Sequence, residues 1–160
     1  GLVTDGVIAT SEAQASAIWA LRETIPLANR KVGAVSSHDI SLPLSAIPGF
    51  IDEAPRVIAG LGAFRVNCFG HLGDGNLHYN VFPAQGRRRE DYEALRKPVM
   101  EAEHDLVVTR FNGSISAEHG IGRSKRDELP RFKSAVEMEL MHGIKAVFDP
   151  NGIMNPGKVV

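Results

Sequence analysis

The chain has 160 residues, and its 18 Lys and Arg against 19 Asp and Glu give a formal net charge of −1. This balance disfavours nucleic acid and anionic membranes as partners, because both select a surplus of basic side chains. Hydrophobic residues make up 43% of the chain, which is enough for a core and too many for a disordered protein. Charged residues interrupt every apolar stretch before the ~18 residues that a membrane span requires, so we expect a soluble protein without a transmembrane segment.

The only cysteine and the first residues both bear on the origin of the chain. A lone Cys68 excludes an internal disulfide and is typical of a reducing compartment, so we expect a cytoplasmic location. The chain begins Gly1-Leu2-Val3, without an initiator methionine or a signal segment. We therefore interpret residues 1–160 as a single domain cut from something longer.

The N-terminal part is predicted to start with a helix over residues 11–28. Ser11 can cap this helix, apolar residues follow at helical spacing, and Pro26 is expected to end it early. The next segments are predicted as two extended stretches and a short helix, over residues 31–36, 39–44 and 51–61.

The strongest local signal is a β-hairpin over residues 64–83, because Asp74-Gly75 is a favoured two-residue turn. With these as the turn residues, His71 pairs with His78. Because successive side chains of a strand point to opposite faces, one face of the hairpin is apolar and the other carries most of the polar side chains. The second face carries Asn67, Phe69, His71, His78, Asn80 and Phe82.

A longer helix is predicted over residues 90–111, with a kink or restart at Pro98 and an end at Asn112-Gly113. A glycine-punctuated strand or loop follows over 114–123, and a last helix over 134–148 stops before a proline. This order of elements indicates an α+β domain, with an antiparallel sheet covered by helices.

Two histidines that face each other across a hairpin suggest a metal site. Their Cβ atoms would lie about 5 Å apart, so the imidazoles of His71 and His78 could reach one ion. Glu118, in a glycine-rich loop, is the best candidate for a third ligand. Two histidines and one carboxylate leave coordination positions open, as catalytic sites do. Spacing alone leaves open the alternative that both histidines are ordinary strand residues beside a turn.

Two further residues are candidates for chemistry. His119 is a potential general base because its unperturbed pKa is near neutral, although a positioning or capping role fits the pattern too. Arg22 could hold a carboxylate with two hydrogen bonds, or it could be a solvated surface residue. Cys68 lies on the apolar face of the hairpin and is a poor nucleophile candidate. The remaining histidines are interpreted as structural or surface residues: His38, His104 and His142.

Three motifs in order resemble the C-terminal part of FAD-linked 2-hydroxyacid oxidoreductases. They are GHLGDGNLHYN at 70–80, SISAEHGIG at 114–122 and DPNGIMNPGK at 149–158. The family includes D-lactate dehydrogenase, the glycolate oxidase subunit and D-2-hydroxyglutarate dehydrogenase, of the vanillyl-alcohol-oxidase superfamily. The resemblance implies a ferredoxin-like cap domain with C-terminal helices, cut from a flavoprotein. The FAD-binding domain would lie N-terminal to it and be absent here, so the fragment alone would be inactive.

The resemblance also implies roles for single residues. The ion would be Zn²⁺ or Mn²⁺, held by His71, His78 and Glu118. Asn80 and Arg22 would contact a small 2-hydroxy acid, and His119 would take the hydroxyl proton while the Cα hydride passes to the flavin. The motifs assign neither FAD-binding residues nor an electron acceptor.

Two positions depart from the family pattern, since Ser37 and Pro26 stand where relatives carry Lys and Thr near the substrate. These departures leave the identity of the hydroxy acid open. The alternatives are a stand-alone metal-binding domain without redox activity and a metal-dependent hydrolase or oxygenase. The ending at 149–158 favours the flavoenzyme. A domain cut from a larger sheet should expose apolar surface, so we expect self-association.

Overall fold

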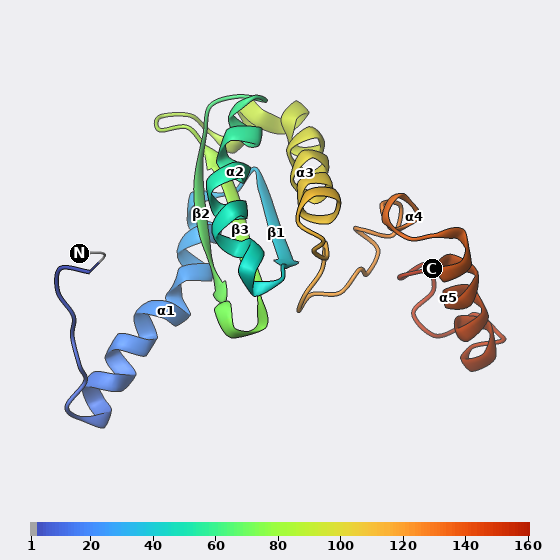
Figure 1. Ribbon diagram of the computed structural model, residues 1–160, viewed down its shortest axis with the longest axis horizontal. Coiled ribbons are helices and arrows are strands. Elements are labelled where there is room, and N and C mark those ends of the chain that lie inside the picture. Colours follow the sequence, from blue (N-terminus) through green and yellow to red (C-terminus); the bar gives the residue numbers. More distant parts are fainter. Residues whose placement is uncertain (1–2) are drawn as a thin grey trace.

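The computed structural model describes residues 3–160, which form a three-stranded antiparallel sheet with helices (Figure 1). Its elements are α1 (Glu12–Val32), β1 (Ser36–Ser41), α2 (Ile47–Ala59), β2 (Phe64–His71), β3 (Asn76–Pro83), α3 (Arg96–Asp105), α4 (Leu129–Phe132) and α5 (Ala135–Phe148). The strand order is β1-β3-β2. The predicted α+β class is confirmed, while the ferredoxin-like comparison stays an expectation.

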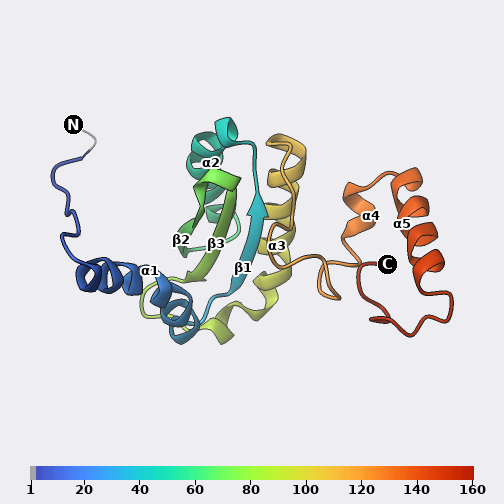
Figure 2. The same cartoon turned by 90° about the horizontal axis from the view of Figure 1, so that it is seen from below.

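The hydrophobic core lies between one face of the sheet and helices α2 and α3. The sheet contributes Ile40, Leu77, Tyr79 and Val81, all at most 5% exposed. Helix α2 contributes a stripe at three- and four-residue spacing, which is one face of a helix: Ile47, Phe50, Ala54 and Ile58. Helix α1 lies on the opposite side of the sheet (Figure 2). The polar face predicted for the hairpin therefore looks toward α1, away from the core.

Helix α1 is longer than predicted. Ser11 caps it as expected, with its Oγ accepting the N–H of Gln14 at 3.2 Å. The predicted end at Ala28 is wrong, because the helix continues past Pro26 to Val32 and is capped by Gly33, where φ is +79°. The helix contains no buried residue in the described chain, so water can satisfy the carbonyl that the missing proline N–H leaves free.

Strands β2 and β3 form the predicted hairpin with a different register. Phe69 lies opposite His78, and His71 lies opposite Asn76, so the predicted pairing of the two histidines is wrong. The cause is a longer connection: a 3-10 turn over Leu72–Asp74 precedes Gly75, which is left-handed with φ +70°. The shift is an even number of residues, so both histidines keep the same face and lie diagonally across the strands.

The turn between β2 and β3 requires glycine at position 75. A Cβ there would lie 2.1 Å from the backbone oxygen of Leu42, and the left-handed conformation strains other residues by about 1–2 kcal/mol. Gly75→Ala should therefore lower the free energy of unfolding by about 2 kcal/mol or more in chemical denaturation. Gly73→Ala, where a Cβ meets nothing within 4 Å, is the matched control. Equal stabilities of the two variants would contradict the turn geometry.

The middle helical segment is divided. A 3-10 stretch over Arg89–Leu95 leads into α3, and a π-helical turn over Leu106–Arg110 follows it. Pro98 lies in the first turn of α3, where its missing N–H removes no helical hydrogen bond, so the predicted restart is confirmed. Asn112, with φ +51°, ends the segment at the predicted place.

The C-terminal helices lie beyond the sheet, on the side away from α1 (Figure 1). Ser134 and Glu137 form a capping box that starts α5, and the helix ends before Asp149 and a proline, as predicted. No helix within residues 3–160 is long and apolar enough to cross a membrane.

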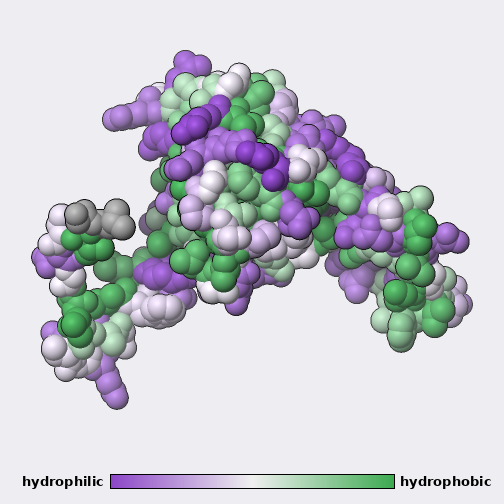
Figure 3. Space-filling model, in the orientation of Figure 1, coloured by the Kyte–Doolittle hydropathy of each residue, from purple (hydrophilic) through white to green (hydrophobic). Residues whose placement is uncertain are grey.

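The apolar faces of α1 and α5 are exposed in this chain (Figure 3). In α5, exposed apolar side chains recur as Val136, Leu140, Ile144, Val147 and Phe148, between 60% and 78% exposed. We therefore expect the isolated chain to self-associate with rising concentration, as light scattering would show. Leu140→Glu should shift the distribution toward monomer. A clean monomer at high concentration of the unmodified chain would contradict this expectation.

Candidate metal and substrate site

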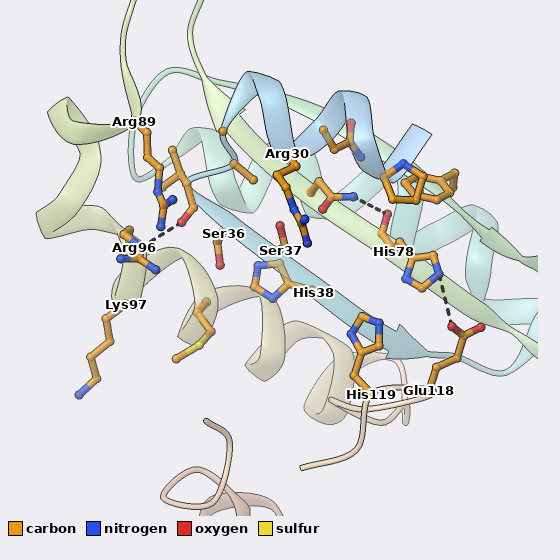
Figure 4. Close-up of a pocket in the computed structure, with 18 of the residues that line it drawn as sticks. Arg30, Ser36, Ser37, His38, His78, Arg89, Arg96, Lys97, Glu118 and His119 are labelled. Carbon is orange, nitrogen blue, oxygen red and sulfur yellow. Dashed lines mark hydrogen bonds and ion pairs between the residues drawn. The ribbon is translucent and has the colours of Figure 1, made fainter. Parts of the chain in front are cut away.

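A pocket of about 1080 Å³ lies between α1, the polar face of the sheet and the loop after α3 (Figure 4). All of the predicted site residues line it: Arg22, His71, His78, Asn80, Glu118 and His119. They come from four separate segments, namely α1, β2, β3 and the loop. The fold thus brings together residues that lie up to a hundred positions apart in the sequence.

The three candidate metal ligands converge at one end of this pocket. Nε2 of His71 lies 3.1 Å from Oε1 of Glu118, and Nε2 of His78 lies 3.8 Å from Oε2 of the same carboxylate. The two imidazole centroids are 6.2 Å apart. One ligand atom from each residue thus lies within 4.8 Å of the others.

This donor set fits a divalent ion. Two imidazole nitrogens and a carboxylate are ligands of Zn²⁺ and Mn²⁺, and bonds of about 2.0–2.2 Å place tetrahedral zinc ligands about 3.3–3.6 Å apart. The observed separations of 3.1 and 3.8 Å bracket that range. The side chains of His71 and Glu118 are 47% exposed, so the far side of the cluster is open to a small ligand.

Asp39 organises this end of the pocket, although it was not among the predicted site residues. Its carboxylate is 2% exposed, and Oδ2 accepts the backbone N–H groups of Glu118 and His119, each at 2.7 Å. Oδ1 accepts a hydrogen bond from Nδ2 of Asn76 at 2.8 Å and lies 3.6 Å from Nδ1 of His78. The buried Asp39 side chain of β1 therefore holds the backbone of the loop at Glu118 and His119. It also faces the imidazole of His78, which it could orient.

Two pKa shifts follow from these contacts. Burial by itself raises the pKa of Asp39, but the hydrogen bonds from His119, Asn76 and Glu118 outweigh it and hold that pKa below 3.8. Burial lowers the pKa of His78 below 6.5, against the attraction of the two neighbouring carboxylates. Asp39 is thus ionised and His78 neutral at pH 7, and a neutral imidazole is the form that binds metals.

The other predicted residues surround the three ligands. The ring of His119 stacks on that of His78 with centroids 5.8 Å apart, and its side chain is 69% exposed. Arg22 places Nη2 3.3 Å from Nε2 of His71. A guanidinium can only donate, so this contact is a hydrogen bond in the tautomer of His71 whose Nε2 carries the lone pair, and the same nitrogen lies 3.1 Å from Oε1 of Glu118. Asn80 is 7% exposed and donates to the carbonyl of His78 at 3.3 Å.

The opposite end of the pocket is basic, which the sequence did not reveal because its cations come from two distant segments. Figure 4 shows Arg89, Arg96 and Lys97 at this end, away from Glu118 and His119. Arg30 of α1, Ser37 and Pro26 line the pocket as well. Arg89 is the last of three consecutive arginines and lines the pocket.

The cysteine is unsuited to nucleophilic chemistry. Burial and the nearby charge of Glu103 raise the pKa of Cys68 to about 11, so its thiolate is scarce at neutral pH. The chemistry available in this pocket is therefore metal binding, proton transfer at an exposed imidazole and recognition of anionic groups.

Comparison with known proteins agrees with this geometry. The family of FAD linked oxidases, C-terminal domain, matches residues 1–159, and the chain belongs to this family. It is 40% identical over 170 residues to a D-2-hydroxyglutarate dehydrogenase of Stutzerimonas stutzeri (strain A1501), covering 99% of this chain and 34% of that protein. It is 41% identical to the mitochondrial D-2-hydroxyglutarate dehydrogenase of Arabidopsis thaliana, covering 100% of this chain and 27% of that protein.

The chain thus spans about a third of the length of the curated relatives that it matches. The predicted family resemblance is confirmed, and membership of the FAD-linked oxidases implies FAD as the cofactor. Several relatives are named as mitochondrial, and a cytoplasmic location of this chain stays a prediction.

Proposed function

We propose that the chain is the substrate- and metal-binding C-terminal portion of an FAD-dependent dehydrogenase that oxidises a D-2-hydroxy acid to the 2-oxo acid. One observation carries this proposal: two imidazoles and a carboxylate converge beside an exposed histidine in a chain of the FAD-linked oxidase family. The names of the relatives support the reaction class.

The proposed metal ligands are His71, His78 and Glu118, with Zn²⁺ or Mn²⁺ as the ion. Such an ion, when bound, would stabilise negative charge on the substrate oxygen. The chain's own contribution is to hold the ligands in place, because Asp39 fixes the backbone of Glu118 and lies close to the ring of His78.

His119 is the proposed general base. Its ring is exposed, stacks on a proposed ligand and is attached to a backbone that Asp39 holds, so its position relative to a bound hydroxyl is fixed. It would accept the hydroxyl proton as the Cα–H bond breaks, with FAD accepting the hydride. Arg22 and Asn80 would bind the substrate carboxylate.

The basic end of the pocket favours a substrate with a second anionic group. Its four cations outnumber the one acidic residue there, Glu93, which pairs with Arg96 at 3.0 Å: they are Arg30, Arg89, Arg96 and Lys97. Ser37 and Pro26 add no charge to this end. We therefore propose a hydroxy diacid such as D-2-hydroxyglutarate in preference to D-lactate or glycolate, with its second carboxylate at this end.

The test uses the whole protein loaded with FAD and follows bleaching of the oxidised flavin under anaerobic conditions. D-2-hydroxyglutarate should reduce the flavin, D-lactate should do so at lower kcat/KM, and the L-enantiomers should not. An unreduced flavin with every D-2-hydroxy acid would overturn the proposed reaction. A colourless whole protein that binds metal would instead support a stand-alone metal-binding domain.

A further inference from the structure

A second cluster of metal-ligating side chains lies outside the pocket site, between β1 and α3. His38 of β1 and the neighbouring Glu103 and His104 of α3 are 3%, 0% and 1% exposed. Nδ1 of His38 lies 3.0 Å from Oε2 of Glu103 and 3.3 Å from Nε2 of His104, and the latter two atoms are 3.7 Å apart. Three potential ligand atoms thus form a small triangle inside the protein.

The dimensions of this triangle match a zinc ion. Bonds of about 2.0–2.2 Å to tetrahedral zinc place its ligands about 3.3–3.6 Å apart. The three observed separations, 3.0, 3.3 and 3.7 Å, lie around that value. The second oxygen of Glu103 can supply a fourth donor atom by bidentate binding, and the burial of all three side chains leaves no access for a substrate, unlike in the pocket site.

Among the three proposed ligands, Glu103 lacks protein partners. Both of its carboxylate oxygens belong to the buried polar atoms of residues 3–160 without a hydrogen-bond partner. The two imidazole nitrogens of the triangle, Nδ1 of His38 and Nε2 of His104, lie at hydrogen-bond distance from each other, and the unpaired nitrogen of His38 is the other one, Nε2. The short approach of His38 to Glu103 does not have hydrogen-bond geometry. An ionised carboxylate with no exposure and no hydrogen bond is strongly disfavoured unless a cation compensates it. Lys125 is the neighbouring cation, but its Nζ donates to the carbonyl of Ile115 and forms no hydrogen bond with Glu103. A divalent ion on Oε2 would compensate the carboxylate directly.

A fourth residue completes the arrangement usual around a metal-bound histidine. Oε2 of Glu128 lies 2.6 Å from Nδ1 of His104. Metal-binding histidines commonly donate their second ring N–H to a carboxylate, which fixes the tautomer and turns the other nitrogen toward the ion. With Nδ1 donating to Glu128, the lone pair on Nε2 of His104 points toward His38 and Glu103.

We propose that His38, Glu103 and His104 bind a structural zinc ion, with Glu128 orienting His104. The ion joins β1 to α3 and, through Glu128, to the residue that precedes α4. It thereby anchors both ends of the loop that carries Glu118 and His119. The alternative is a metal-free hydrogen-bond network through His38, His104 and Glu128, and zinc content separates the two.

The experiment measures zinc by elemental analysis in the natural full-length protein, purified without chelator or histidine tag and supplied with Zn²⁺ before gel filtration. Wild type should hold two ions per chain, while His71→Ala and Glu103→Gln should hold one each. Glu101→Gln, which removes a half-exposed charge from the same helix, is the matched control and should keep both. The ion left in His71→Ala should resist a chelator that strips the exposed site within minutes.

A Glu103→Gln protein with the zinc content of wild type, or a His71→Ala protein with none, would overturn the buried site. Should Glu103→Gln fail to fold, the ion remaining in His71→Ala and its resistance to chelator decide alone. An unchanged zinc content in His71→Ala, with one ion lost in Glu103→Gln, would instead contradict the pocket site and support the buried one.

Discussion

His119→Asn should lower kcat by roughly 10²–10⁴, the contribution typical of a positioned general base. The exposed imidazole is the part of His119 that the proposed reaction uses, while its backbone N–H holds the loop on Asp39. Asparagine keeps that backbone bond and removes only the titrating ring. The metal content and the KM for the hydroxy acid should therefore change little, because neither the proposed ligands nor the loop backbone is altered.

The control for this prediction is His142→Asn, which removes an exposed imidazole from α5. It should leave kcat unchanged in the same flavin-reduction assay. A His119→Asn protein that keeps more than about a tenth of the wild-type kcat would show that another group takes the proton. A parallel loss of metal and activity would show instead that His119 serves the site structurally.

Asp39→Asn should weaken metal binding in the pocket by about 10–100-fold, the effect usual for residues that orient ligands from behind. The carboxylate accepts on both oxygens, from Asn76 on one and from the backbone of Glu118 and His119 on the other. An amide offers only one acceptor and presents its N–H₂ group to the remaining donors. The buried donors left unpaired should lower the free energy of unfolding by about 1–3 kcal/mol.

This loss of stability should depend on pH with a definite sign. The folded-state pKa of Asp39 lies below 3.8, so its ionised form stabilises the fold above that pH. The difference in unfolding free energy between wild type and Asp39→Asn should be full above pH 5 and shrink as the pH falls below 3.8. Asp74→Asn, in the exposed hairpin turn, is the control and should show no such difference. A pH-independent difference would contradict the ionised role.

The sequence predicted the fold best where local rules decide the outcome. Ser11 and Ser134 cap their helices as expected, and the hairpin follows from an Asp-Gly pair. The register failed because the turn type depends on Gly75 packing against the backbone of Leu42, which is a tertiary contact. The prediction that His71 and His78 lie on one face of the sheet is nevertheless correct, because a register error of two residues leaves each side chain on the same face.

The site was predictable only through the residues with recognisable motifs. His71, His78 and Glu118 were identified from spacing and resemblance, and they do converge. Asp39 was missed because a single aspartate in a strand has no periodic signature, and its role comes from accepting backbone groups far along the chain. Glu103 was missed for a related reason, since a carboxylate in a charged helical segment is ordinarily expected to be solvated.

The most direct test of the account is the metal content of the whole protein, compared between wild type and His71→Ala after purification without chelator. This substitution should remove one zinc or manganese ion per chain, because it deletes one of three converging ligands. His142→Ala should remove none. Equal metal contents in wild type and His71→Ala would contradict the claim that the pocket beside His119 is a metal site.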